Sequence, residues 1–160
     1  MKNITISYNE YNSDKELPEA DRELIAKARE IEAKAYSIYS KFSVGAAVLL
    51  SSGKVIVGNN QENIAYPSGM CAERVALFSA MAQFPEEDVI TIAITASSKE
   101  FEVKHPISPC GACRQVISEY ELKQKKEIRI LLSVTDGKVL EIPSSLSLLP
   151  FVFNEEGLKN

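Results

Sequence analysis

The stretch "PSGMCAERVALF" (residues 67–78) places a thiol, an acid and a base at the start of an apolar pattern. The apolar residues that follow recur at helical spacing, so residues 71–83 are predicted to form a helix. Cys71, Glu73 and Arg74 then lie in its first turn. Free N–H groups and the helix dipole favour negatively charged side chains at this position.

A second motif, "SPCGACRQV" (residues 108–116), holds the other two of the chain's three cysteines. Cys110 directly precedes a helix predicted over residues 111–124, and Cys113 lies one turn into it. Both thiols can therefore face one point near the start of this helix. A helix start also favours the thiolate form, which is the form that binds metals.

Three thiolates from two helix starts can bind one Zn²⁺ ion. Three protein ligands leave the fourth tetrahedral position to water, as in catalytic zinc sites, whereas structural sites close with four protein ligands. His105, the only histidine, is the candidate fourth ligand of a structural alternative. A C-x-x-C pair also occurs in thioredoxin-like redox proteins, but there it usually follows the first strand of a βαβ unit.

An acid and two arginines accompany the cysteines. Glu73 can be a simple helix-start acid, but close to Cys71 it can also take a proton from water at the open position. Three thiolates and one Zn²⁺ sum to a charge of −1. Arg74 and Arg114 are predicted to offset this charge by donating hydrogen bonds to the sulfurs, with solvated surface arginines as the alternative.

The rest of the chain alternates helical and strand patterns. The run "VITIAITAS" (residues 89–97) is typical of a strand covered on both faces. The other predicted elements are a helix at about 18–36, a hairpin over 43–60, strands at 127–134 and 138–142, and a short helix at 144–149. This order predicts an α/β fold: a three-layer α/β/α sandwich with a mixed, about five-stranded sheet.

Length and composition narrow the class of protein. A chain of 160 residues, 45% apolar and 25% charged, favours one domain over residues 1–160, with residues 1–16 as an edge strand or a loose N-terminal extension. A net charge of −4 argues against polymeric nucleic acid as the partner. Neither a signal peptide nor a membrane-spanning run is recognised, so we expect no membrane partner and a cytoplasmic location, where thiols stay reduced.

The two cysteine motifs resemble those of the zinc-dependent cytidine deaminase family in its small three-cysteine form. The segment "YSKFSVGAAV" (39–48) looks like the family's pocket-wall strand, and "GNNQEN" (58–63) looks like its ribose-binding segment. The segment "LLPFVF" (148–153) looks like its C-terminal motif. Ile38 stands where the family more often has proline, which indicates a local change in the loop.

The resemblance implies one Zn²⁺ per chain, bound by Cys71, Cys110 and Cys113, with Glu73 as the proton shuttle. It also implies a homotetramer whose active sites are shared between subunits. The substrate contacts that it implies are Phe42 on the pyrimidine ring, Asn60 and Glu62 on the ribose hydroxyls, Ala72 at the 4-amino group, and Phe153 closing the pocket of a neighbouring subunit.

The implied reaction is the hydrolytic deamination of cytidine and deoxycytidine to uridine and deoxyuridine plus ammonia, in pyrimidine salvage. The amide of Asn60 and the carboxylate of Glu62 suit hydroxyl groups better than a phosphate, which predicts nucleoside substrates. The alternatives are a deaminase of a modified cytosine nucleoside and a non-catalytic zinc-stabilised binding module. A deoxycytidylate deaminase fits less well, because its usual motif has histidine at the position of Cys71.

Overall fold

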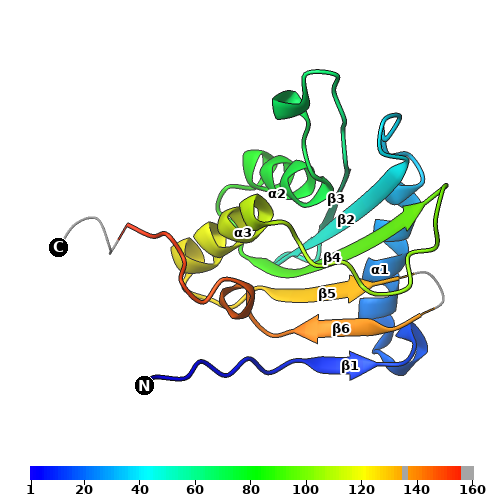
Figure 1. Cartoon of the computed structure of the whole chain (residues 1–160). Helices are drawn as coiled ribbons and strands as arrows, with labels where there is room; N and C mark the ends of the chain where they lie inside the picture. Colours follow the sequence, from blue (N-terminus) through cyan, green and yellow to red (C-terminus); the bar gives the residue numbers. More distant parts are fainter. Residues whose placement is uncertain (135–136, 156–160) are drawn as a thin grey trace.

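The computed structural model describes residues 1–134 and 137–155 (Figure 1). The helices in this part of the chain are α1 (Glu19–Glu32), α2 (Ala72–Gln83) and α3 (Gly111–Gln124). The strands are β1 (Asn9–Tyr11), β2 (Phe42–Leu50), β3 (Val55–Asn59), β4 (Val89–Ser98), β5 (Arg129–Ser133) and β6 (Val139–Ile142). Short 3-10 helices are η1 (Asp14–Glu16), η2 (Tyr66–Ser68) and η3 (Ser145–Leu148).

The strands form one mixed sheet in the order β1-β6-β5-β4-β2-β3. Strands β4 and β5 pair in parallel, and the other neighbouring pairs are antiparallel. Figure 1 shows α2 and α3 side by side on one face of the sheet and α1 on the other. Each face has its own apolar core, so the central strand β4 is buried along most of its length. The predicted three-layer α/β/α sandwich is confirmed.

The sheet has six strands where about five were predicted, because the N-terminal segment, expected to be an edge strand or a loose extension, adds β1 at the edge of the sheet. The apolar alternation lies in residues 3–8, but the pairing strand is Asn9–Tyr11. The Tyr11 hydroxyl donates to Glu141 at 2.7 Å, and Glu141 also accepts from Arg129 at 2.9 Å. Hydrogen bonds to side chains near β6, which is distant in the sequence, thus determine which residues form β1. The local alternation of apolar residues does not determine this.

The first helix ends four residues earlier than the predicted boundary at residue 36. The Tyr36 N–H donates to the Asn60 carbonyl at 3.0 Å, and the Glu62 N–H donates to the Tyr36 carbonyl at 2.9 Å. Tyr36 thereby forms an isolated parallel β-bridge with Gln61, in the segment after β3. This pairing competes with continued helix, and it brings residues 37–41 next to residues 60–62.

The remaining boundaries agree with prediction within about two residues. The hairpin of β2 and β3 turns at Gly53, whose φ of 85° lies in the left-handed region that favours glycine. The predicted helix over 144–149 is the shorter 3-10 helix η3. Within the described residues, no helix has both the length and the apolar character needed to cross a membrane.

Two glycines allow helices to approach the hairpin closely from opposite faces. A Cβ atom on Gly45 in β2 would lie 2.0 Å from the Ala28 carbonyl oxygen of α1. A Cβ atom on Gly58 in β3 would lie 2.4 Å from the backbone nitrogen of Ala76 in α2. Because α2 rests on the backbone of β3, its first turn, which carries Cys71 and Glu73, is held at a fixed height above the sheet.

Candidate functional site

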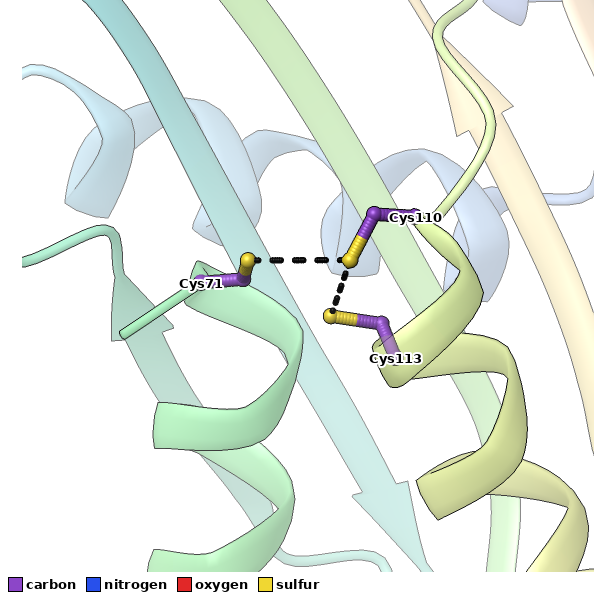
Figure 2. Close-up of side chains that lie close together, drawn as sticks. All are labelled: Cys71, Cys110 and Cys113. Atoms are coloured by element: carbon purple, nitrogen blue, oxygen red, sulfur yellow. Dashed lines mark hydrogen bonds between the residues drawn. The ribbon is translucent and has the colours of Figure 1, made fainter. Parts of the chain in front are cut away.

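The three cysteines meet between the starts of α2 and α3. Cys71 is the N-cap residue of α2, Cys110 is the N-cap residue of α3, and Cys113 lies in the first turn of α3. Figure 2 shows their sulfur atoms pointing toward one another across the gap between the two helices. The Cys71 and Cys110 sulfurs are 3.8 Å apart, and those of Cys110 and Cys113 are 3.5 Å apart.

These spacings fit a tetrahedral metal. Zn–S bonds of about 2.3 Å that meet at the tetrahedral angle place two sulfurs about 3.8 Å apart. All three sulfurs lie within 4.8 Å of one another, and the cluster contains no other histidine, cysteine or acidic ligand among the described residues. His105 is therefore outside the cluster. The donor set is that of a three-sulfur site with one position open.

The charge on the cluster is uneven. The pKa of Cys71 is lowered to about 5, chiefly by a hydrogen bond from the Cys113 thiol and then by Arg74. The pKa of Cys113 is raised, because it donates to Cys71 and is itself buried. Three thiols this close together cannot all ionise unless a cation lies between them. The site is thus built to bind a positively charged ion.

Arg74 makes the predicted contact with a sulfur. Its Nη2 atom lies 3.5 Å from the Cys71 sulfur and donates to it. The Arg74 Nε atom is buried without a hydrogen-bond partner in the described part of the chain. The guanidinium group is therefore directed at the cysteine cluster, where its charge opposes that of the thiolates.

Arg114 has partners other than those predicted. It donates to the Pro109 carbonyl at 2.8 Å, the Leu148 carbonyl at 3.1 Å and the Ser108 hydroxyl at 3.1 Å. Within residues 1–134 and 137–155 it makes no hydrogen bond to a sulfur. Its position next to Cys113 suggests such a bond, but the side chain turns back along α3. Arg114 instead fastens the loop that carries Cys110 to the segment around η3.

Glu73 lies in the first turn of α2, and its side chain is directed inward. The residue is only 5% exposed, and its carboxyl group is within hydrogen-bonding reach of the Cys113 thiol. Burial is the main cause that raises the pKa of this carboxyl group, and the nearby Cys71 charge adds to it. The residue before it, Ala72, is fully buried at the start of the helix. An acid is thus held beside the sulfur cluster.

A cavity of about 550 Å³ opens next to Cys71 and Arg74. Two of the predicted sugar-binding residues, Asn60 and Glu62, line it. Tyr39, Ser40, Gln61 and Asn63 also line it and lie in the two segments that the resemblance indicated, whereas Tyr66, Gly69 and Met70 had no signal in the sequence. They come from two loops that no local pattern connects, so only the folded chain brings them together. Its size is within the range of small-molecule sites.

The Asn60 side chain braces the start of β2. Its Oδ1 atom accepts from the Val44 N–H at 2.8 Å, and its Nδ2 atom donates to the Phe42 carbonyl at 3.0 Å. The Phe42 ring stacks on Phe101 with ring centroids 6.2 Å apart and planes 10° apart. Phe42 does not line the cavity. Its backbone is held by the side-chain amide of Asn60, a residue that does line it.

The Glu62 carboxylate is held by the loop that precedes β2. Its Oε2 atom accepts from the Tyr39 and Ser40 N–H groups at 2.8 and 3.3 Å, and its Oε1 atom accepts from the Ser40 hydroxyl. The pKa of Glu62 is lowered because these hydrogen bonds to the carboxylate outweigh the cost of its partial burial. Glu62 is therefore an ionised hydrogen-bond acceptor with a fixed orientation.

The last predicted residue, Phe153, lies away from the cavity and is 67% exposed. Its backbone is bonded in both directions to the Gln115 side chain: Gln115 donates to the Phe153 carbonyl at 2.7 Å and accepts from the Phe153 N–H at 3.3 Å. Gln115 follows Arg114 in the first turns of α3. The backbone of Phe153 is thus bonded to α3, the helix whose start holds Cys110 and Cys113.

Comparison with known proteins places this site in a family. The family model "Cytidine and deoxycytidylate deaminase zinc-binding region" matches residues 18–126. The cytidine deaminase of Halalkalibacterium halodurans is 41% identical over 125 residues, 78% of this chain and 87% of the relative. That of Sporosarcina psychrophila is 38% identical over 123 residues, 77% of this chain and 83% of the relative.

The solved structures agree with the sequences. The crystal structure of cytidine deaminase from Burkholderia pseudomallei matches with a TM-score of 0.71 and 40% identity, covering 82% of this chain and 97% of that chain. The matched region of the family model includes the helix starts that bring the three cysteines together. The resemblance seen in the two cysteine motifs is confirmed, and the chain belongs to the zinc-binding cytidine and deoxycytidylate deaminase family.

Proposed function

We propose that this protein is a zinc-dependent enzyme that hydrolyses cytidine and deoxycytidine to uridine and deoxyuridine plus ammonia, in pyrimidine salvage. The observation that carries the proposal is the arrangement at the start of α2. Three sulfurs at tetrahedral spacing lie beside the buried acid Glu73, and one of the three residues, Cys71, lines a cavity that Asn60 and Glu62 also line. The named activity of the matched relatives supports the same reaction.

Cys71, Cys110 and Cys113 would hold one Zn²⁺ per chain. When bound, the ion supplies a water molecule of lowered pKa for attack on the substrate. Arg74 donates to the Cys71 sulfur and so withdraws part of the excess negative charge that three thiolates bring. Arg114 acts on the site less directly, because it holds the Ser108–Cys110 loop in place.

Glu73 moves the protons in this proposal. Its carboxylate takes a proton from the attacking water, and the resulting acid gives a proton to N3 of the cytosine ring as the oxygen adds to C4. Glu73 then takes the second water proton from the new C4 hydroxyl and passes it to the 4-amino group, so that the C4–N bond breaks, ammonia leaves and the C4 carbonyl forms. The peptide group of Ala72 and the Ser108–Cys110 loop would orient that amino group. Burial keeps the carboxyl group next to the reacting atoms and shields it from bulk water.

The substrate class follows from the polar groups of the cavity. Asn60 and Glu62, which line the cavity, would contact the sugar hydroxyls, and Phe42, whose carbonyl accepts from Asn60, would pack on the pyrimidine ring from outside the described cavity lining. Arg74 is the only cation among the described lining residues, and it already donates to Cys71. A phosphate brought to the sugar end would meet the Glu62 carboxylate. We therefore propose nucleosides as substrates, and not nucleotides or polymers.

An absorbance assay tests this function. Values of kcat/KM for cytidine and deoxycytidine are expected within about tenfold of each other, a gap of about 1.4 kcal/mol. Cytidine monophosphate and a short cytosine-containing strand should react far more slowly, because Glu62 repels the phosphate. A chelator should abolish activity, and added zinc should restore it. Equal rates with cytidine and its monophosphate would refute the proposed sugar contacts.

Glu73→Gln tests the proton shuttle. The amide has the same shape but cannot accept the proton, so kcat should fall by at least about 10²–10⁴. The zinc content should stay unchanged, because Glu73 is not one of the proposed ligands. Glu86→Gln, which alters an exposed acid just after α2, is the matched control and should keep full activity. A Glu73→Gln enzyme with a tenth of the original kcat would rule out this role.

We also propose a single domain in a homotetramer, located in the cytoplasm, where the thiols stay reduced. Large apolar side chains remain exposed at the tip of the η2 loop and near the C-terminus: Ile64, Tyr66, Phe151 and Phe153. Each of these two segments thus offers apolar surface that contact with another protein chain would bury. Phe153 would then close the pocket of a neighbouring subunit.

Light scattering on the purified protein tests the assembly. We expect four times the chain mass at micromolar concentration, because burial of the exposed aromatic side chains stabilises the oligomer. Phe153→Ala should lower kcat/KM even where the tetramer persists, since the ring belongs to a neighbour's pocket. A fully active monomer would contradict both the tetramer and the shared site.

A further inference from the structure

The turn that precedes β2 has a strained backbone next to the cavity. Lys41 has a φ of 56°, although it is not a glycine, and its N–H donates to the Ser37 carbonyl at 3.0 Å. Left-handed backbone is unfavourable at such a residue and persists only where surrounding contacts maintain it. The turn directs the backbone N–H groups of Tyr39 and Ser40 toward Glu62.

The Ser40 hydroxyl lies at a junction between two proposed substrate contacts. It accepts from the Phe42 N–H at 3.1 Å, and it donates to Oε1 of Glu62. Phe42 is the proposed partner of the base, and Glu62 is the proposed partner of the sugar. Two hydrogen bonds through a single oxygen atom thus join the elements that would hold the two halves of a nucleoside.

We propose that Ser40 is a positioning residue for recognition of the substrate sugar, acting through the carboxylate of Glu62. The inference rests on the proposed function and names a residue that the sequence did not single out. With two N–H donors on Oε2 and the hydroxyl on Oε1, the carboxylate cannot rotate freely. The remaining lone pair of Oε1 is then left to accept from a sugar hydroxyl.

Loss of the hydroxyl should therefore weaken sugar binding and leave the chemical step intact. Without it, Oε1 loses one of its restraints, while Tyr39 and Ser40 still supply their backbone N–H groups to Oε2. Hydrogen bonds to charged groups are stronger than those between neutral groups, so the loss should be measurable, although the two N–H groups still hold Oε2. Among the described residues, the hydrogen bonds of Ser40 go to Phe42 and Glu62 and none goes to a cysteine or to Glu73, so kcat should change little.

The test compares Ser40→Ala with the unmodified enzyme on two ligands. We expect the KM for cytidine to rise about tenfold, with kcat within twofold. The inhibition constant of 2′,3′-dideoxycytidine, measured by competition against cytidine, should change by less than twofold, because this nucleoside lacks the hydroxyls that Glu62 would bind. Ser40→Thr retains the hydroxyl and should restore the KM. Ser40→Gly removes the same group and replaces Ser40→Ala if that variant aggregates.

Two controls separate positioning from a general effect on the turn. Ser37→Ala removes another hydroxyl of the same turn, one that is hydrogen-bonded to the Ser43 hydroxyl at 2.9 Å. This variant should leave the KM for cytidine and the inhibition constant of 2′,3′-dideoxycytidine unchanged. Adding Ser40→Ala to Glu62→Ala should cause no further rise in KM. An equal loss for both ligands, or an unchanged KM for cytidine, would overturn the inference alone. A protein without deaminase activity would overturn the proposed function together with it.

Discussion

The structure depends on bringing three thiols together at one point. Three sulfurs within 4.8 Å repel one another as thiolates, so a cation between them is required for all three to ionise. The fold meets this requirement with two helix starts. Helix α2 rests on the backbone of β3 at Gly58, and α3 lies beside α2 on the same face of the sheet (Figure 1). The dipoles of both helices then favour negative charge at the same point.

Two sets of hydrogen bonds connect the surroundings of the cysteine cluster to the rest of the proposed active site. On the side of α3, Arg114 and Gln115 bond to the segment around η3 and to the backbone of Phe153. On the side of the cavity, Asn60 braces β2, and Glu62 is held by residues 39–40. These links are hydrogen bonds between segments far apart in the sequence. A substrate would therefore meet groups whose relative positions are set before it binds, which lowers the cost of ordering them.

The sequence predicted what depends on local order and missed what depends on distant partners. The helix starts at Cys71 and Cys110 follow from spacing within about twelve residues, and the buried run at 89–97 identifies β4. The strand β1 and the early end of α1 are set by pairing with β6 and with residues 60–62. Arg114 was assigned to a sulfur because of its neighbour in sequence, whereas one of its partners is Leu148. Ser40 has no local signature, since Glu62 lies 22 residues away.

Catalysis in this proposal requires that the cysteine cluster binds one zinc ion and leaves one position open. X-ray absorption at the zinc edge, with metal analysis of the purified protein, tests it most directly. We expect one zinc per chain, with three sulfurs at about 2.3 Å and one oxygen or nitrogen at about 2.0 Å that exchanges with solvent or ligand. A shell of four sulfurs, a histidine in the fourth position, or a protein that folds and deaminates without zinc would contradict it.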